Sequence, residues 1–152
     1  MAALLVLAVV ALAGLAMAGC SGGASSTTLT SEAQSATSEA TQVTYVTVEV
    51  QQAFDALSAN KDAQIVDVRE PGEWATTGVA VGSVLIPLGQ LEQSAPAELA
   101  KDKPVYVICN SGNRSRTGSD ILLKLGYAKV FNVAGGIQAW LKAGLAVETY
   151  KP

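Results

Sequence analysis

The chain has 152 residues, with 10 Lys and Arg against 13 Asp and Glu, a formal charge of −3 and no His. Its length suits one domain of ordinary size. The acidic balance argues against a nucleic-acid-binding surface. Without His, the chain holds no Ser-His-Asp or Cys-His catalytic site and no His-bound metal. Two Cys are too few for a zinc site of four Cys or His ligands, and they disfavour a disulfide framework.

The N-terminal segment has the composition of a targeting signal. Residues 2–19 contain only Ala, Leu, Val, Gly and Met, which is typical of a membrane-spanning helix or of the apolar core of a signal peptide. Small residues precede Cys20, and this resembles the lipobox of bacterial lipoproteins. We therefore expect residues 1–19 to be a signal peptide and Cys20 to carry a lipid. The alternative is an uncleaved anchor. Either way, the domain should be tethered to a membrane at the cell envelope, outside the cytoplasm.

The stretch from residue 20 to residue 42 is predicted to be a linker. After Cys20 it consists mainly of Ser, Thr, Ala, Gly and Gln, with almost no large apolar side chain. Such a segment buries too little surface to offset the entropy of ordering it. We expect it to be flexible and to have no specific partner, so that residues 43–152 form the folded domain.

Residues 43–152 alternate strand-like and helix-like segments. Thr47 is expected to cap the first helix, with Glu49 in the first turn. Its apolar face consists of Val50, Ala53, Phe54 and Leu57. The other predicted helices cover residues 88–99, 115–125 and 137–143. The predicted strands cover residues 43–46, 63–68, 83–86, 104–108 and 129–133. This alternation favours an α/β fold with a mainly parallel central sheet.

Two loops leave the expected carboxyl ends of strands, where α/β proteins bind ligands. One starts at Asp67 and the other at Cys109. The turn after Cys109 contains Gly112, so successive backbone N–H groups can converge on an anion, and the next helix adds its positive end. Arg114 adds a permanent charge. These effects favour thiolate over thiol and predict a nucleophilic Cys109. The alternative is an inert core Cys followed by a simple capping loop.

Four motifs carry a family resemblance in this region. They are, in chain order, Asp67-Val68-Arg69-Glu70-Pro71-Gly72-Glu73-Trp74; Gly78, Gly82 and Ile86-Pro87; Cys109-Asn110-Ser111-Gly112-Asn113-Arg114-Ser115; and Asn132-Val133-Ala134-Gly135-Gly136 with Ala139-Trp140 and Ala143-Gly144. Together they resemble the pattern of rhodanese-type sulfurtransferases over roughly residues 44–150. The resemblance implies one rhodanese-like domain of three layers, with helices on both faces of the sheet.

The resemblance also implies a chemistry. Cys109 would take sulfane sulfur from a small anionic donor such as thiosulfate, hold it as a persulfide, and pass it to cyanide or a thiol in a double displacement. No cofactor or metal is implied, and the domain is expected to act as a monomer. By position, the persulfide cradle would consist of Asn110, Ser111, Gly112, Asn113, Arg114 and Ser115. Arg114 would also bind the anionic donor.

Asp67 and Arg69 fall on a motif that neighbours the Cys109 loop, and we expect both to support the site. Asp67 is expected to accept hydrogen bonds from the loop amides or to pair with Arg114. Arg69 is expected to form a local ion pair with Glu70 or Glu73.

Four further motif residues have structural interpretations. We interpret Trp74 and Trp140 as core residues. Gly135-Gly136 is interpreted as a turn that needs positive φ before a helix.

Three other functions compete with sulfur transfer. A dual-specificity phosphatase of the same fold has five residues between Cys and Arg, whereas this chain has four, Asn110 to Asn113. A thiol–disulfide oxidoreductase would need a resolving Cys, which the folded region lacks. The remaining alternative is a non-catalytic rhodanese-like module that binds a partner or senses oxidants.

Overall fold

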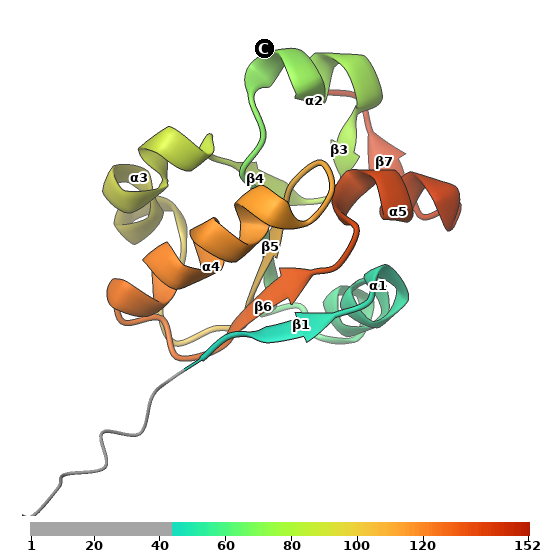
Figure 1. Ribbon diagram of the computed structural model, residues 1–152. Helices are drawn as coiled ribbons and strands as arrows, with labels where there is room; N and C mark the ends of the chain where they lie inside the picture. Colours follow the sequence, from blue (N-terminus) through green and yellow to red (C-terminus); the bar gives the residue numbers. More distant parts are fainter. Residues whose placement is uncertain (1–43) are drawn as a thin grey trace, which may run out of the picture. The chain divides into compact units, whose positions relative to one another are not determined.

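The computed structural model describes residues 44–152 (Figure 1). The predicted signal peptide, Cys20 and the linker therefore lie outside the described residues. The strands are β1 (Val46–Val48), β2 (Gln64–Asp67), β3 (Val79–Ala80), β4 (Ser83–Leu85), β5 (Val105–Ile108), β6 (Val130–Val133) and β7 (Val147–Glu148). The helices are α1 (Val50–Ala59), α2 (Pro71–Thr77), the 3-10 turn η1 (Leu88–Gln90), α3 (Leu91–Glu98), α4 (Asn113–Lys124) and α5 (Gly136–Lys142). Within residues 44–152, no helix is both long enough and apolar enough to cross a membrane.

The domain has three layers around a parallel sheet, as the alternation of elements predicts. Five strands form the sheet in the order β1-β6-β5-β2-β4, and every neighbouring pair is parallel. Helices α3 and α4 cover one face of the sheet, and α1 and α5 cover the other (Figure 1). The fold class expected from the sequence is confirmed.

The side chains of β5 show why both faces need helices. Val105 and Val107 point into the cluster that includes Leu91 of α3 and Leu122 of α4. Tyr106 and Ile108 point to the opposite face, where α1 and α5 pack. Successive side chains of a strand alternate between faces, so a strand that is apolar throughout must be covered on both sides.

The sheet register brings the two candidate loops together. Asp67, the last residue of β2, is paired in register with Ile108, the last residue of β5. The backbone N–H of Val68 donates to the Ile108 carbonyl at 2.9 Å. Cys109 therefore leaves the sheet beside the segment that begins at Asp67.

The start of the domain differs from its prediction. Thr47 does not cap a helix: it lies in the middle of β1, paired in register with Asn132 of β6. The N-cap of α1 is Glu49, whose backbone N–H donates to the Gln52 side chain at 3.0 Å in a capping box. The strand predicted at residues 43–46 lies later because pairing with β6 keeps the backbone extended through Val48.

Sequence reasoning missed α2 and the ribbon formed by β3 and β7. Helix α2 carries two start signals, Pro71 in the first turn and a capping box between Glu70 and Glu73. These residues also belong to the first family motif, and the predicted helices do not include them. The antiparallel pair β3 and β7 joins Val79–Ala80 to Val147–Glu148. Strands of two residues have too little periodicity to be recognised in a sequence.

The C-terminal end of α3 is held by one buried side chain. The hydroxyl of Tyr127 donates to the carbonyls of Ala95 at 2.8 Å and Leu99 at 3.1 Å. We expect Tyr127→Phe to lower the free energy of unfolding by about 1–2 kcal/mol, because buried carbonyls lose a donor. Tyr106→Phe is the matched control, since its ring is also buried and burial, with no hydrogen bond within residues 44–152, raises the pKa of its hydroxyl. Denaturant unfolding of both variants measures the difference, and equal losses would contradict this account.

Candidate active site

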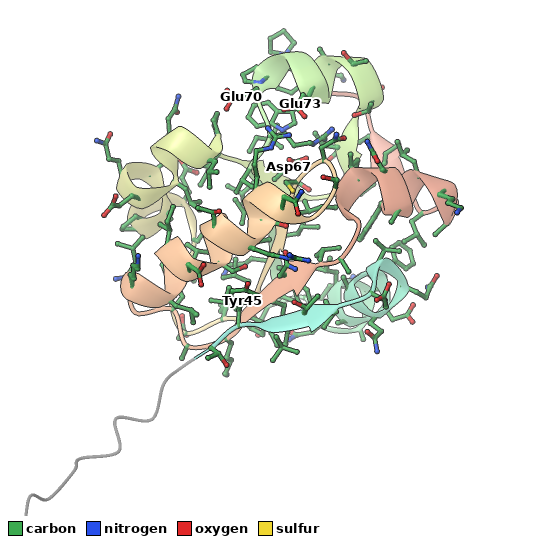
Figure 2. The ribbon with its side chains drawn as sticks, in the orientation of Figure 1. Tyr45, Asp67, Glu70 and Glu73 are labelled. Atoms are coloured by element: carbon green, nitrogen blue, oxygen red, sulfur yellow. The ribbon has the colours of Figure 1, made fainter. Side chains whose placement is uncertain are left out.

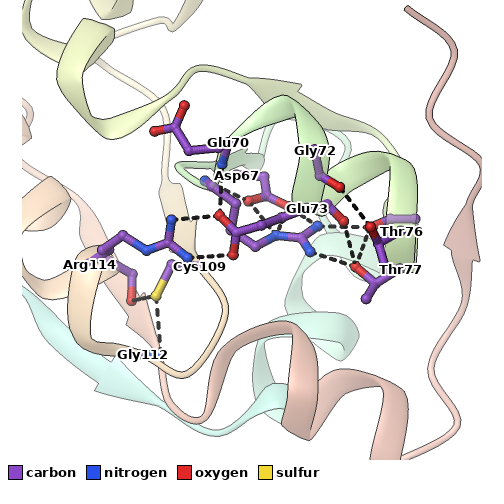
Figure 3. Close-up of polar contacts among 12 residues, drawn as sticks. Asp67, Glu70, Gly72, Glu73, Thr76, Thr77, Cys109, Gly112 and Arg114 are labelled. Atoms are coloured by element: carbon purple, nitrogen blue, oxygen red, sulfur yellow. Dashed lines mark hydrogen bonds and ion pairs between the residues drawn. The ribbon is translucent and has the colours of Figure 1, made fainter.

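The loop between β5 and α4 curls around the sulfur of Cys109. The residue is only 1% exposed. The backbone N–H of Gly112 donates to Sγ at 3.1 Å (Figure 3), and Gly112 adopts a φ of +94° as the N-cap of α4. The thiol donates to the hydroxyl oxygen of Ser115, which lies 3.5 Å from Sγ. The loop thus turns polar hydrogens toward the sulfur, and the N-terminus of a helix of 12 residues follows it.

These contacts change the acidity of the thiol. Burial raises the pKa of Cys109, whereas the hydrogen bond with the Ser115 side chain and those from the amides of Ser115, Gly112 and Ser111 lower it. The hydrogen bonds outweigh burial, so the pKa lies below the ordinary value of a thiol. This direction agrees with the sequence prediction, and the thiolate is the nucleophilic form.

Helix α5 holds the outer side of the loop. The N–H of Ile137 donates to the carbonyl of Cys109 at 2.8 Å, and that of Gln138 donates to the carbonyl of Asn110 at 3.2 Å. Gly135 and Gly136 have φ of +69° and +58°, which confirms the predicted turn. A Cβ on Gly136 would overlap the Cys109 carbonyl oxygen. The glycine pair therefore serves the loop as well as the turn.

Asp67 and Arg69 form a closed buried pair. Both side chains are 0% exposed. Nε of Arg69 donates to both carboxylate oxygens of Asp67 at 2.9 Å, and Nη2 donates to Oδ2 at 2.7 Å. Nη1 also donates to the hydroxyl of Thr77 and Nη2 to the carbonyl of Gly78, each at 2.7 Å. The pair thereby fastens the end of α2 to the end of β2.

This geometry corrects two expectations about the pair. Within residues 44–152, the side-chain bonds of Asp67 come from Arg69, so Asp67 neither pairs with Arg114 nor accepts from the loop amides. Arg69 likewise does not pair with Glu70 or Glu73. The reason is local. The Arg69 side chain is only two residues from Asp67, and its guanidinium binds both oxygens of the buried carboxylate.

Arg114 pairs with Glu73 of α2. Its Nη1 donates to Oε2 at 2.7 Å and its Nη2 to Oε1 at 2.6 Å, a two-pronged ion pair (Figure 3). The Arg114 hydrogen bond lowers the pKa of Glu73 to about 2, against the opposing effect of burial. Glu73 raises the pKa of Arg114 in return. Figure 2 shows Asp67, Glu70 and Glu73 gathered at the α2 end of the domain.

Asn132 belongs to the site, although the sequence analysis assigned it no role. The Ser115 hydroxyl donates to Oδ1 of Asn132 at 2.6 Å, and Asn132 is 1% exposed. A buried amide within an otherwise apolar strand was the available signal, because such a group needs partners. The identity of that partner depends on tertiary packing.

The predicted cradle residues divide into four groups. Gly112 and Ser115 contact the sulfur, and the Ser111 amide lowers the thiol pKa. Asn110 contributes its carbonyl to the contact with α5. Asn113 and the Ser111 side chain are exposed at the rim. Arg114 points to Glu73.

Two other observations bear on the site and its surroundings. Trp74 and Trp140 are buried in the core, as predicted, with 3% and 2% exposure. The described residues hold no group of three or more Cys, Asp or Glu side chains placed to bind a metal ion.

A family model described as "Rhodanese-like domain" matches residues 50–143. The chain is 32% identical over 100 residues to a sulfurtransferase of Allochromatium vinosum, covering 66% of this chain and 92% of that protein. It is 40% identical over 80 residues to the uncharacterized protein YqhL of Bacillus subtilis, covering 53% of this chain and 62% of that protein.

A solved structure has the same fold. The rhodanese-related protein of Thermoplasma volcanium is 33% identical with a TM-score of 0.62, and the match covers 70% of this chain and 100% of that chain. The chain therefore belongs to the Rhodanese-like domain family. Its relatives include named sulfurtransferases, which supports sulfur transfer in general as its chemistry.

The contact between Gly136 and the Cys109 carbonyl predicts an unequal effect of alanine at two glycines. Gly144 also has positive φ, +69°, but a Cβ there meets nothing within 4 Å. We expect Gly144→Ala to lower the free energy of unfolding by about 1–2 kcal/mol, the cost of a left-handed alanine. Gly136→Ala should cost about 1–3 kcal/mol more because of the overlap. Denaturant unfolding measures both, and equal costs would contradict the role of Gly136 in closing the loop.

The depressed pKa of Glu73 predicts a specific pH dependence. Because its folded-state pKa is about 2 against an ordinary 4.5, its contribution to stability is present above pH 4.5 and is lost as pH falls toward 2. Glu73→Gln should lower the free energy of unfolding at pH 7 by at most about 1 kcal/mol, since the pair is one-third exposed. The difference from the wild type should shrink below pH 4.5 in urea unfolding. A difference that stays constant with pH would show that the carboxylate charge is not what matters.

Proposed function

We propose that this protein is a sulfurtransferase that carries sulfane sulfur as a persulfide on Cys109. The observation that carries the proposal is the environment of the Cys109 sulfur. The sulfur is buried at the centre of a loop, the Gly112 N–H donates a hydrogen bond to it, and the pKa of the thiol is lowered. This arrangement activates a thiolate without a histidine base, in agreement with a chain that has no His.

The proposed cycle has two displacements. The Cys109 thiolate attacks the outer sulfur of thiosulfate, the S–S bond of thiosulfate breaks, and sulfite leaves with the electron pair. The product is a persulfide whose outer sulfur carries the negative charge. A cyanide ion or a thiolate then attacks that outer sulfur, the persulfide S–S bond breaks, and the Cys109 thiolate returns. Each step exchanges one anion for another, so neither an oxidant nor a cofactor is needed.

The loop and Arg114 have distinct roles in this proposal. Inward amides and the N-terminus of α4 stabilise the negative outer sulfur. Each Nη of Arg114 donates one hydrogen to Glu73 and retains a second. We propose that these remaining hydrogens bind the sulfonate oxygens of the donor. The near-complete burial of Cys109 favours a slender donor whose terminal sulfur reaches the thiolate.

We propose that this reaction takes place at the cell envelope. The support comes from the apolar N-terminal run and from Cys20, which the sequence places like the lipidated Cys of a bacterial lipoprotein. A lipid on Cys20 would tether the domain to the membrane surface through residues 21–42. The acceptor would then be a small thiol, cyanide or a persulfide-accepting protein outside the cytoplasm.

The test is the mass of the full chain after treatment with thiosulfate. We expect the mass of one added sulfur atom, located on the tryptic peptide 102–114 that contains Cys109 and removed by cyanide. Cys109→Ser should gain no cyanide-labile sulfur. If neither thiosulfate nor a low-molecular-weight persulfide adds sulfur to Cys109, the proposal is wrong. The non-catalytic binding or redox-sensing module would then be the better account.

A further inference from the structure

A continuous row of polar side chains runs from Cys109 to the edge of the sheet. The Cys109 thiol donates to Ser115 at 3.5 Å, and the Ser115 hydroxyl donates to Oδ1 of Asn132 at 2.6 Å. Nδ2 of Asn132 donates to the hydroxyl oxygen of Thr47 at 3.3 Å. Cys109, Ser115 and Asn132 are buried, whereas Thr47 is exposed on β1. The row thus links the reactive sulfur to the protein surface through β6 and β1.

The register of the sheet fixes the order of the side chains in this row. Asn132 is paired in register with Thr47 on one side and with Val107 on the other. Residues paired in register on parallel strands share a face, so Thr47 and Asn132 are neighbours there. Val107 packs in the cluster beneath α4, the helix that carries Ser115. The amide of Asn132 consequently lies between the hydroxyls of Ser115 and Thr47.

The directions of the hydrogen bonds in this row are compatible with the thiol form of Cys109 and not with the thiolate. The Ser115 hydroxyl has one hydrogen, and it is directed to Asn132. Once the thiol loses its proton to water, the sulfur can only accept. A Ser115 hydroxyl that turned to the sulfur would leave Oδ1 of Asn132 without a donor, and such a buried acceptor is costly.

An amide can remove this conflict because it carries both donors and an acceptor. If the Asn132 amide turns over, Nδ2 donates to Ser115 and Oδ1 accepts from the Thr47 hydroxyl. The Ser115 hydroxyl is then free to donate to the sulfur, and every group in the row keeps a partner. No proton moves along the row, since only the directions of its hydrogen bonds reverse.

We infer that Asn132 is a positioning residue for Cys109. When the thiol of Cys109 ionises, the side-chain amide of Asn132 turns over, so that the Ser115 hydroxyl donates to the thiolate. An ionised Asp at this position could only accept, so it would keep the Ser115 hydrogen. The inference concerns ionisation and depends on the proposed sulfur transfer only in naming Cys109 as the reactive group.

The other charged groups near Cys109 do not account for a turn of the Asn132 amide when the thiol ionises. From α2, Glu73 has a pKa of about 2 and is paired with Arg114, while Glu70 lies at the exposed N-cap. At the end of β2, Asp67 and Arg69 form a closed pair. Strands β1 and β6 and the first turn of α5 carry no charged side chain.

The test is an NMR titration of the full chain in detergent micelles, without any sulfur donor. The Cβ shift of Cys109 reports its ionisation, and nuclear Overhauser contacts report the direction of the Asn132 amide. We expect the Nδ2 hydrogens to contact Thr47 at low pH and Ser115 at high pH, with the same midpoint as Cys109. In Cys109→Ser the contacts should not change with pH.

A second variant tests the consequence for the sulfur. Asn132→Asp should raise the Cys109 midpoint by at least one pH unit, which is tenfold less thiolate at any pH well below it. An unchanged midpoint in a folded variant would overturn the inference. Should the variant fail to fold, the wild-type titration decides. Amide contacts that stay constant while Cys109 ionises would also overturn the inference, whether or not the chain transfers sulfur.

Discussion

The site depends on the direction in which the peptide groups of one loop face. A peptide group is planar, so its N–H and C=O point in opposite directions. For amides such as that of Gly112 to face the sulfur, the neighbouring carbonyls have to face outward and find donors elsewhere. Helix α5 supplies those donors from Ile137 and Gln138 to the carbonyls of Cys109 and Asn110. The close approach is possible only because residue 136 has no Cβ.

Two ion pairs connect the sheet to the mouth of the loop. The buried pair of Asp67 and Arg69 ties α2 to the end of β2 through Thr77 and Gly78. Because α2 is held there, Glu73 in its first turn meets Arg114. Arg114 is thereby kept at the rim with a defined orientation, which matters because a free arginine would lose much side-chain entropy on binding a donor. The first pair thus serves the site indirectly, by placing the second.

The polar side chains beneath Cys109 have a different role from the apolar core around them. Ser115 and Asn132 are buried where an apolar pair would cost less to desolvate. They satisfy one another, and both lie within hydrogen-bonding reach of the sulfur or of its partner. Polar groups in such a place specify which hydrogen bonds the thiol and the thiolate can form. Stability alone does not explain their presence.

Local patterns in the sequence determined much of the fold and the chemical centre. The apolar runs that became β2, β5 and β6 are strands in any context that buries both faces, and Gly144 ends α5 where the pattern placed it. The motif around Cys109 also identified the loop before its geometry was known. These features follow from residue type and spacing within one short segment, which a sequence displays directly.

Only the tertiary structure decided which partners the side chains have. Thr47 looks like a helix cap in isolation, yet pairing with β6 makes it part of a strand. The sequence left Asp67 several partners, and packing assigned it Arg69 while Arg114 went to Glu73. Asn132 became part of the site through a contact with Ser115, 17 positions away in the chain. Such contacts depend on the register of the sheet and on the helices above it, and no short segment of sequence encodes either one.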